Sequence, residues 1–246
     1  MSQVCAVVLA AGKGTRMRSP EPKVLVPVAG RPLVGHLLGA LEGAGVRDVV
    51  VVIGHRADEV RAALGPRYRY ALQSEQRGMA HAVACAREAV GDAEQVVVTV
   101  GDAPLLRAAT FARMLDHHGR TDAACTFLTS VYPEPLPPYA RVIRDPSGRV
   151  VHCVEERSAT PEQRQVRELL TSQYVFQAEA LWAHLGGVAP HPDTGELYLT
   201  DIVPLLIAAG RRVEAVVVDD HTELTGPNTL EEVAWAEARL AERDER

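Results

Sequence analysis

The sequence predicts an α/β fold with a doubly wound, mostly parallel central sheet. Valine-rich apolar runs at residues 4–10, 48–53 and 95–100 have the composition of strands that are buried on both faces. Segments with the apolar spacing of helices separate these runs, which is the pattern of repeated βαβ units. The first and third runs end in glycine-containing loops, and sheets of this kind bind ligands beyond the carboxyl ends of their strands.

The first half of the chain alternates strands with helices. Residues 32–44 show the helical pattern, because Leu33, Leu37 and Leu41 recur on one face and Pro32 suits a first turn. The predicted strands are 4–10, 48–53, 70–72 and 95–100, and the predicted helices are 32–44, 57–64 and 79–90.

The second half is less regular, and proline-rich segments interrupt it at residues 133–138 and 190–192. Its predicted strands are 124–131, 141–143, 149–154 and 171–176, and its predicted helices are 178–185, 200–209 and 230–242. The length fits one large α/β domain. We expect a single domain, 1–246, with a regular half up to about residue 120, an irregular half, 121–228, and a C-terminal helix, 229–246.

Composition excludes several classes of protein. The formal net charge of −6 does not favour nucleic acid or an anionic membrane as a partner. There is no run of about 18 apolar residues, so we expect no membrane span, and the N-terminus lacks a signal-peptide pattern. The four cysteines form no CxxC pair, so we expect them to be reduced and buried, as in a cytoplasmic protein. The oligomeric state stays open.

A glycine-containing loop follows the first strand and carries a cluster of cations. Its glycines permit backbone N–H groups to approach a phosphate closely. Only two of the 26 lysine and arginine residues are lysines, and both lie in this region, where an ammonium suits a phosphate oxygen. Lys13, Arg16 and Lys23 place three positive charges within eleven residues, which suits the roughly four negative charges of a triphosphate.

We therefore expect this loop to bind a polyphosphate. The alternative is a surface loop with solvated charges, and neither the GxxxxGK[ST] nor the GxGxxG pattern is present. The residues expected to line the nucleotide are Leu9, Ala10, Ala11, Gly12, Lys13, Gly14 and Thr15, and the expected charge-neutralising groups are Arg16 and Lys23.

Gly101 and Asp102 end the third apolar run, at the same edge of the predicted sheet as the first loop. A carboxylate there suits Mg²⁺, a hard cation that prefers oxygen ligands and bridges substrate phosphates. Alone, Asp102 fits a helix cap or a turn equally well. Together with the first loop, it predicts a site for magnesium and a polyphosphate.

A third segment, 72–82, combines glutamines with a glycine. A glutamine amide both donates and accepts hydrogen bonds, which suits the edge of a pyrimidine base. We expect Gln73, Gln76 and Gly78 to contact a base, although an ordinary strand-to-helix connection has a similar composition.

These three segments, in this order, resemble the sugar-nucleotide pyrophosphorylases, a superfamily of nucleotidyltransferases. The chain is most similar to the uridylyltransferase domain of the bacterial bifunctional N-acetylglucosamine-1-phosphate enzyme. The similarity covers most of the chain and includes Val154-Glu155, Gly195-Glu196, Thr200-Asp201 and Asn228. It implies a Rossmann-like fold of the nucleotide-diphospho-sugar transferase type, with a nucleotide-binding first half and a sugar-phosphate-binding second half.

The resemblance implies magnesium-dependent transfer of a nucleotidyl group from a nucleoside triphosphate, with UTP favoured over dTTP, to a sugar-1-phosphate. Pyrophosphate is the second product. Arg16 and Lys23 would neutralise the phosphates, and Asp102 and Asn228 would hold Mg²⁺. Glu155 would bind a sugar hydroxyl. Gln73 and Gly78 would recognise a uracil-like base, assisted by the backbone near Ala10.

The chain departs from this family on the sugar side. Val100 replaces a tyrosine, Ala140 a glycine and Leu170 an asparagine, so Ala140 and Leu170 stand at sugar-contacting positions. Loss of the asparagine leaves substrate hydrogen-bonding groups unpaired. We therefore predict that N-acetylglucosamine-1-phosphate is a poor substrate and that a different sugar-1-phosphate is the acceptor. The acetyltransferase half is missing, so acetyl transfer is not expected.

Two other functions stay open from the sequence. One is nucleotidyl transfer to a non-sugar phosphate, such as a polyol phosphate, phosphocholine or a phosphonate. The other is a non-catalytic, nucleotide-binding regulatory subunit, against which the joint presence of Lys23, Asp102 and Asn228 argues.

Overall fold

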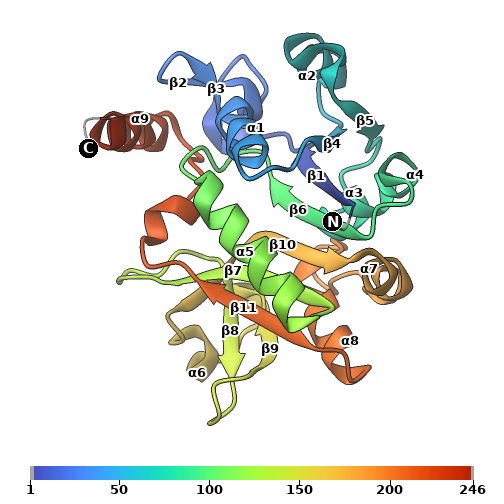
Figure 1. Ribbon diagram of the computed structural model, residues 1–246. Helices are drawn as coiled ribbons and strands as arrows, with labels where there is room; N and C mark the ends of the chain where they lie inside the picture. Colours follow the sequence, from blue (N-terminus) through green and yellow to red (C-terminus); the bar gives the residue numbers. More distant parts are fainter. Residues whose placement is uncertain (1–2, 245–246) are drawn as a thin grey trace.

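The computed structural model describes residues 3–244, and within them one mixed sheet of nine strands forms the centre of the fold (Figure 1). The strands in order across the sheet are β11 (Val213–Val217), β7 (Cys125–Val131), β10 (Glu168–Gln177), β6 (Gln95–Val100), β1 (Val4–Ala10), β4 (Asp48–Ile53) and β5 (Arg69–Leu72). Beside β10, β8 (Ala140–Arg144) pairs with it, and β9 (Val150–Val154) pairs with β8.

Along the main path of the sheet, four of the six strand pairs in the described residues are parallel, as predicted. β1 runs parallel to both β4 and β6, and β4 runs parallel to β5. The exception along the main path is β10, which runs antiparallel to β6 and β7, while β11 is again parallel to β7. The irregular second half therefore joins the first half through one reversed strand, and the predicted mixed α/β class is confirmed.

Helices cover both faces of the sheet because its strands are apolar on both sides. One face packs on α1 (Leu33–Gly43) and α5 (Ala108–Thr121), and the other on α3 (Met79–Cys85), α7 (Ala178–His184) and α8 (Ile202–Ala208). Alternation along β1 serves both faces, since Ala6 and Val8 enter one core and Cys5 and Val7 the other. The remaining helices are α2 (Ala57–Leu64), α4 (Arg87–Val90), α6 (Pro161–Arg164) and α9 (Leu230–Asp244).

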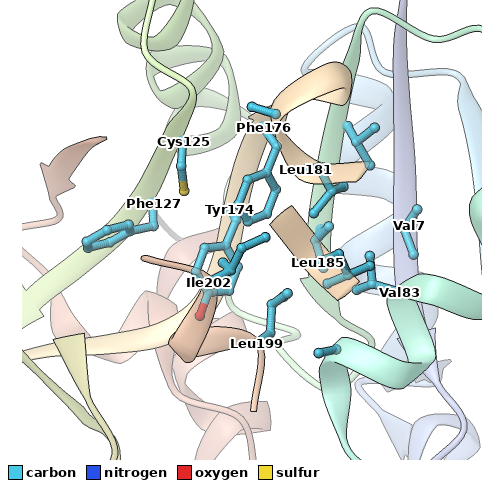
Figure 2. Packing of buried hydrophobic residues seen from close by; sticks show 14 of the residues in the cluster. Val7, Val83, Cys125, Phe127, Tyr174, Phe176, Leu181, Leu185, Leu199 and Ile202 are labelled. Atoms are coloured by element: carbon cyan, nitrogen blue, oxygen red, sulfur yellow. The ribbon is translucent and has the colours of Figure 1, made fainter. Parts of the chain in front are cut away.

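Aromatic side chains fill the core beneath β10. Figure 2 shows Tyr174 and Phe176 projecting from this strand toward the helices, with Phe127 of β7 beside them. The rings of Tyr174 and Phe176 stack with centroids 5.4 Å apart, and Phe127 meets Tyr174 edge-on at 6.1 Å. Such close packing makes the reversed strand a rigid support for the loops around it.

Several predicted boundaries are confirmed and others are wrong. Strands 4–10, 48–53 and 95–100 and helix 57–64 have the predicted ends. The predicted helix 79–90 is two helices, α3 and α4, which are separated by a turn at Ala86. Pro32 lies in the short strand β3 (Arg31–Pro32), which pairs with β2 (Pro27–Val28), and α1 begins one residue later. Cys85 is only half-buried, whereas the other cysteines are buried as predicted, and all four are free thiols.

The prediction omitted the longer elements α5 and β11 and the short elements α6, β2 and β3. The α5 helix buries Phe111, Met114 and His118, which recur at helical spacing on one face. The β11 strand is a valine-rich run that pairs with β7. Both patterns were present in the sequence, so these omissions were errors of detection. Among residues 3–244 no helix combines the length and the apolar character needed to cross a bilayer.

The strand order places the two predicted loops together. The chain leaves β1 toward β4 on one side and later returns to β6 on the other, so β1 lies at a topological switch point. Since β1 and β6 are parallel, their carboxyl ends meet at one edge, where Gly101 N donates to Leu9 O at 2.9 Å. Asp102 therefore starts its loop directly beside Ala10 and Ala11.

Candidate active site

The first loop is held in a tight left-handed turn. Gly14 has a φ of +57° and precedes the 3₁₀ turn η1 (Thr15–Met17). Met17 anchors the loop, because it is buried in a small apolar cluster with Val233 and Ala236 of α9. The predicted site residues of this loop that remain exposed are Gly12, Lys13, Thr15 and Arg16.

Four of the predicted charged and metal-binding residues converge on one point. The Lys23 ammonium donates hydrogen bonds to Asp102 Oδ2 and, at 2.8 Å, to Asn228 Oδ1. Arg16 joins them, since its guanidinium donates to the same Asn228 oxygen at 3.0 Å. Asp102 and Asn228 lie 79 and 205 positions away from Lys23 in the chain, and the fold brings both within hydrogen-bonding distance of it. The side chains of Lys23 and Asp102 are 13% and 24% exposed, so the pair is partly shielded but reachable from solvent.

Two glycines make this convergence possible. A Cβ at Gly14 would lie 2.5 Å from Lys23 Cβ, so the stem of Lys23 lies directly on the turn of the first loop. A Cβ at Gly226 would lie 2.8 Å from Asp102 O and 3.3 Å from Asp102 Oδ1. The segment that ends in Asn228 therefore packs against the back of Asp102, and it does so only because residue 226 lacks a side chain.

The donor set at this point fits a divalent cation. Asp102 offers carboxylate oxygens and Asn228 an amide oxygen, and hard cations such as Mg²⁺ prefer these ligands. Both groups already share one positive charge, the Lys23 ammonium, so their oxygens are aimed at a common centre. Within residues 3–244 no cluster of three or more His, Cys, Asp or Glu side chains has metal-binding geometry. A magnesium ion here would therefore complete its shell with substrate oxygens and water.

Tyr139 belongs to this site although the sequence did not indicate it. Burial, together with the nearby charges of Asp102 and Glu232, raises the pKa of its phenol to about 12, against the opposing effect of the Arg16 charge. Its ring packs edge-on against Tyr132, with centroids 5.7 Å apart. Tyr139 thus brings a neutral hydroxyl from the second half of the chain into the field of Asp102 and Arg16.

The predicted base-binding residues form a hydrogen-bonded corner. Gln73 is 4% exposed, and its Nε2 donates to Gly78 O at 3.0 Å and lies 3.1 Å from His81 Nδ1. Gln76 Nε2 donates to Gln73 O at 3.2 Å. Gln73 Oε1 accepts no hydrogen bond from the described residues. It is nevertheless not fully buried. The carbonyl end of this amide is thus the end that faces out.

Gly54, which the sequence reasoning missed, locks this corner to the first loop. A Cβ there would lie 2.8 Å from both Ala11 Cβ and Gln73 O. Gly78 has a second structural reason: its φ is +101°, and a Cβ would lie 2.6 Å from the backbone of Leu197. Gly54 directly follows the predicted strand 48–53. A glycine at such a position indicates a close approach of another backbone, and this signal could have identified it.

Glu155, for which the resemblance implied contact with a sugar, directly follows β9. Its Oε1 accepts a hydrogen bond from Thr200 Oγ1 at 2.5 Å, and the Thr200 hydroxyl lies 3.5 Å from Tyr174 OH in the core. Burial raises the pKa of Glu155, and the Thr200 hydrogen bond opposes this shift. A polar chain thus links the core beneath β10 to a half-buried carboxyl.

Ala140 and Leu170 face each other across β8 and β10 and are buried. They are register partners with exposed fractions of 3% and 2%, and both side chains enter the core cluster beneath the sheet. Beyond Leu170 the strand bulges, and Ser172 adopts a φ of +72°, a conformation that favours glycine. The role of Ala140 and Leu170 in sugar binding stays a prediction.

The predicted site residues lie at one edge of the sheet, and their side chains differ in how much they are exposed to solvent. Ala10 and Ala11 are buried, and Leu9 is half-buried, so they offer backbone rather than side chains. Lys13 is exposed and makes no side-chain hydrogen bond within the described residues. Two shallow hollows on the surface lie elsewhere, one beside Tyr68 and Tyr70 and the other beside Trp182.

Comparison with known proteins gives relatives over the whole described length. The chain is 43% identical over 244 residues to the bifunctional protein GlmU of Heliobacterium modesticaldum, covering 99% of this chain and 53% of that protein. It is 46% identical over 233 residues to the bifunctional protein GlmU of Kineococcus radiotolerans, covering 93% of this chain and 47% of that protein. The chain therefore spans about half the length of these relatives.

Solved structures show the same fold at low sequence identity. A UDP-glucose pyrophosphorylase in complex with UDP-glucose matches with a TM-score of 0.78 at 17% identity, covering 99% of this chain and 100% of that one. The apo form of a UDP-glucose pyrophosphorylase matches with a TM-score of 0.81 at 16% identity and the same coverage. These matches confirm the predicted Rossmann-like fold of the nucleotide-diphospho-sugar transferase type.

The family follows from the sequence match. The MobA-like NTP transferase domain matches residues 6–176, which include the first loop, Gln73 and Asp102. The predicted resemblance to the sugar-nucleotide pyrophosphorylases and to the bifunctional bacterial enzymes is confirmed by these relatives. The chain belongs to the family of MobA-like NTP transferase domains.

Proposed function

We propose that the chain transfers a nucleotidyl group from a nucleoside triphosphate, preferably UTP, to a sugar-1-phosphate and releases pyrophosphate. The observation that carries this proposal is the convergence of Lys23, Asp102 and Asn228 beside the glycine-containing loop. Cations that suit a polyphosphate and oxygens that suit Mg²⁺ meet there at a topological switch point, where folds of this class bind nucleotides. The residues up to about 120 would hold the nucleotide, and residues 121–228 the sugar phosphate.

The chemistry requires positioning and charge neutralisation. An oxygen of the sugar phosphate attacks the α-phosphorus in line, a new P–O bond forms, and the bond from the α-phosphorus to the bridging oxygen breaks with departure of pyrophosphate. The attacking oxygen is already ionised, so no general base is needed. Lys23 and Arg16 would neutralise the phosphates, and backbone N–H groups of the first loop would orient them. Asp102 and Asn228 would hold Mg²⁺, which would supply positive charge to stabilise the polyphosphate and the leaving group.

The preference for a pyrimidine nucleotide rests on Gln73. Its amide nitrogen is engaged by Gly78 O and His81, which leaves Oε1 to accept the N3–H of a uracil or thymine. Cytosine carries no hydrogen at that nitrogen. This arrangement supports UTP or dTTP over CTP.

The sugar side supports an acceptor other than N-acetylglucosamine-1-phosphate. Glu155 has one oxygen held by Thr200, which leaves the other for a sugar hydroxyl. The asparagine of the family is replaced by Leu170, whose side chain enters the core and offers no hydrogen bond. A sugar whose recognition does not depend on that amide is favoured.

A matrix of nucleoside triphosphates against phosphorylated acceptors tests this function. Pyrophosphate release would be measured with UTP, dTTP, CTP, ATP and GTP against several sugar-1-phosphates, a polyol phosphate, phosphocholine and a phosphonate, with Lys23→Met as the blank. We expect turnover with UTP and a sugar-1-phosphate other than N-acetylglucosamine-1-phosphate.

Other results of the matrix would contradict parts of the proposal. If N-acetylglucosamine-1-phosphate with UTP is the best pair, the inferred acceptor is wrong. If release occurs only with non-sugar acceptors, the acceptor class is wrong. Nucleotide binding without release on any acceptor would favour a regulatory subunit.

A further inference from the structure

The two proposed metal ligands both accept hydrogen bonds from one cationic side chain. The Lys23 ammonium donates to Asp102 Oδ2 and to Asn228 Oδ1, and Arg16 donates to that same Asn228 oxygen. A divalent cation that approaches these oxygens meets the positive charge of the Lys23 ammonium at contact distance, and the two charges repel. Metal binding is therefore weakened while Lys23 holds both groups.

We propose that Lys23 is an internal competitor for the metal site, so that a divalent cation binds well only when a polyphosphate draws Lys23 away. The inference rests on the proposed function, because it takes Asp102 and Asn228 as the metal ligands and Lys23 as a phosphate-binding cation. It adds a coupling between the two ligands that neither assignment contains.

The packing around Lys23 fits such an exchange. Its stem lies on Gly14, so that a phosphate held by the first loop would come close to the ammonium. Asp102 is fixed from behind by Gly226, and its neighbour Gly101 is hydrogen-bonded to Leu9 O. The carboxylate thus stays in place while the flexible four-carbon stem of Lys23 turns between carboxylate and phosphate.

The coupling is reciprocal by thermodynamic linkage. If the polyphosphate raises the metal affinity by some factor because it removes Lys23 from Asp102, the metal must raise the polyphosphate affinity by the same factor. An opposite charge within about 4–6 Å lowers the affinity of a carboxylate for a proton by roughly ten- to a thousandfold. A metal ion that competes for Asp102 must overcome the same attraction between the carboxylate and Lys23. We therefore expect an effect of at least about tenfold on the binding of metal alone.

Binding of Mn²⁺ alone, followed by electron paramagnetic resonance in the absence of nucleotide, tests the inference. Lys23→Met should bind Mn²⁺ at least about tenfold more tightly than the unmodified protein. Lys13→Met is the matched control, because it removes the same charge from the same loop but from an exposed side chain that contacts neither Asp102 nor Asn228. Its Mn²⁺ affinity should stay within about threefold of the unmodified protein. Asp102→Asn should weaken binding in every background.

A second readout needs no substitution at Lys23. Since the chain has only two lysines, lysine-selective ¹⁵N labelling gives two ammonium signals, and Lys13→Met assigns them. The hydrogen-bonded Lys23 ammonium should exchange slowly with water. Its signal should persist with Mg²⁺ alone and shift when inorganic pyrophosphate is added with Mg²⁺.

The outcomes separate the inference from the proposed function. Equal Mn²⁺ affinity of Lys23→Met and the unmodified protein, with weaker binding by Asp102→Asn, overturns the competition and leaves the metal site intact. Mn²⁺ binding that Asp102→Asn does not weaken overturns both. A Lys23 signal that shifts fully with Mg²⁺ alone also overturns the competition.

Discussion

At the scale of single residues, the chemistry of the site follows from few side chains whose types are visible in the sequence. Lys23, Asp102 and Asn228 lie far apart in the chain, yet they meet within one hydrogen-bonded cluster. Residue type and position in the loops after two strands indicated Lys23 and Asp102, whereas the resemblance to a known family indicated Asn228. The direct ion pair between Lys23 and Asp102 was not predictable, because sequence patterns indicate which groups share a site but not which of them touch.

The turn at Gly14 provides the sharpest test of how the loop holds Lys23. Gly14→Ala should lower kcat/KM at least about tenfold, because a Cβ there would lie 2.5 Å from Lys23 Cβ and displace it. The control is Gly45→Ala, whose φ is +86° and whose Cβ would meet no atom within 4 Å. Both variants should lose about 1–2 kcal/mol of stability from the left-handed backbone, measured by urea denaturation. Equal kcat/KM for the two variants would show that contact with Lys23 is irrelevant.

Some residues of the site could not be found from their own sequence context. Tyr139 follows a proline-rich segment without periodicity, and it reaches Asp102 only because β8 pairs with β10. Gly226 is required by the backbone of Asp102, a contact across more than a hundred residues. Positions of this kind depend on tertiary packing, which local patterns do not encode.

At the scale of elements, strands buried on both faces were predicted well because valine-rich runs of 6 or 7 residues have few other interpretations. The second half was harder, since β10 is reversed and bulges at Ser172. The helix α5 was missed because the prediction relied on the longest apolar runs, and α5 contains no such run. Its buried face alternates with charged residues and carries His118, a residue that is not typical of a core.

The packing of α5 on β7 should make stability depend on pH. His118 is 1% exposed, and burial lowers its pKa from 6.5 to about 4. Between these values the unfolded chain binds a proton that the folded protein does not, so stability is present above about pH 6.5 and is lost as the pH falls toward 4. The contribution is on the order of 3 kcal/mol.

Urea denaturation at pH 7 and pH 4.5 measures this contribution. His118→Asn keeps a hydrogen-bonding group for Thr126 Oγ1, which lies 3.0 Å from His118 Nδ1, and should reduce the loss of stability on acidification. His117→Asn, one position away on the same helix and half-buried beside Glu214, should retain the full loss. If His118→Asn keeps the pH dependence of the unmodified protein, another group is responsible.

At the scale of the whole molecule, the site depends on the strand order. The chain carries a net charge of −6, yet several cations lie together at the switch point, where the connections that follow two parallel strands run in opposite directions. The local cluster of Arg16, Lys23 and the exposed Lys13 opposes the bulk charge and supplies what an anionic substrate needs. Global composition predicted the absence of a nucleic-acid surface, and the topology explains why an anion is still expected at one edge.

The rate of pyrophosphate release by Asp102→Asn tests the central claim most directly. With UTP and the best acceptor, kcat should fall at least about 100-fold, because the amide cannot supply the charge that holds Mg²⁺ at the polyphosphate. Asp116→Asn, which only breaks an exposed pair with Arg120, should keep the unmodified rate, and both variants should melt within a few degrees of the unmodified protein. Full activity of Asp102→Asn would contradict the claim that this edge of the sheet is the active site.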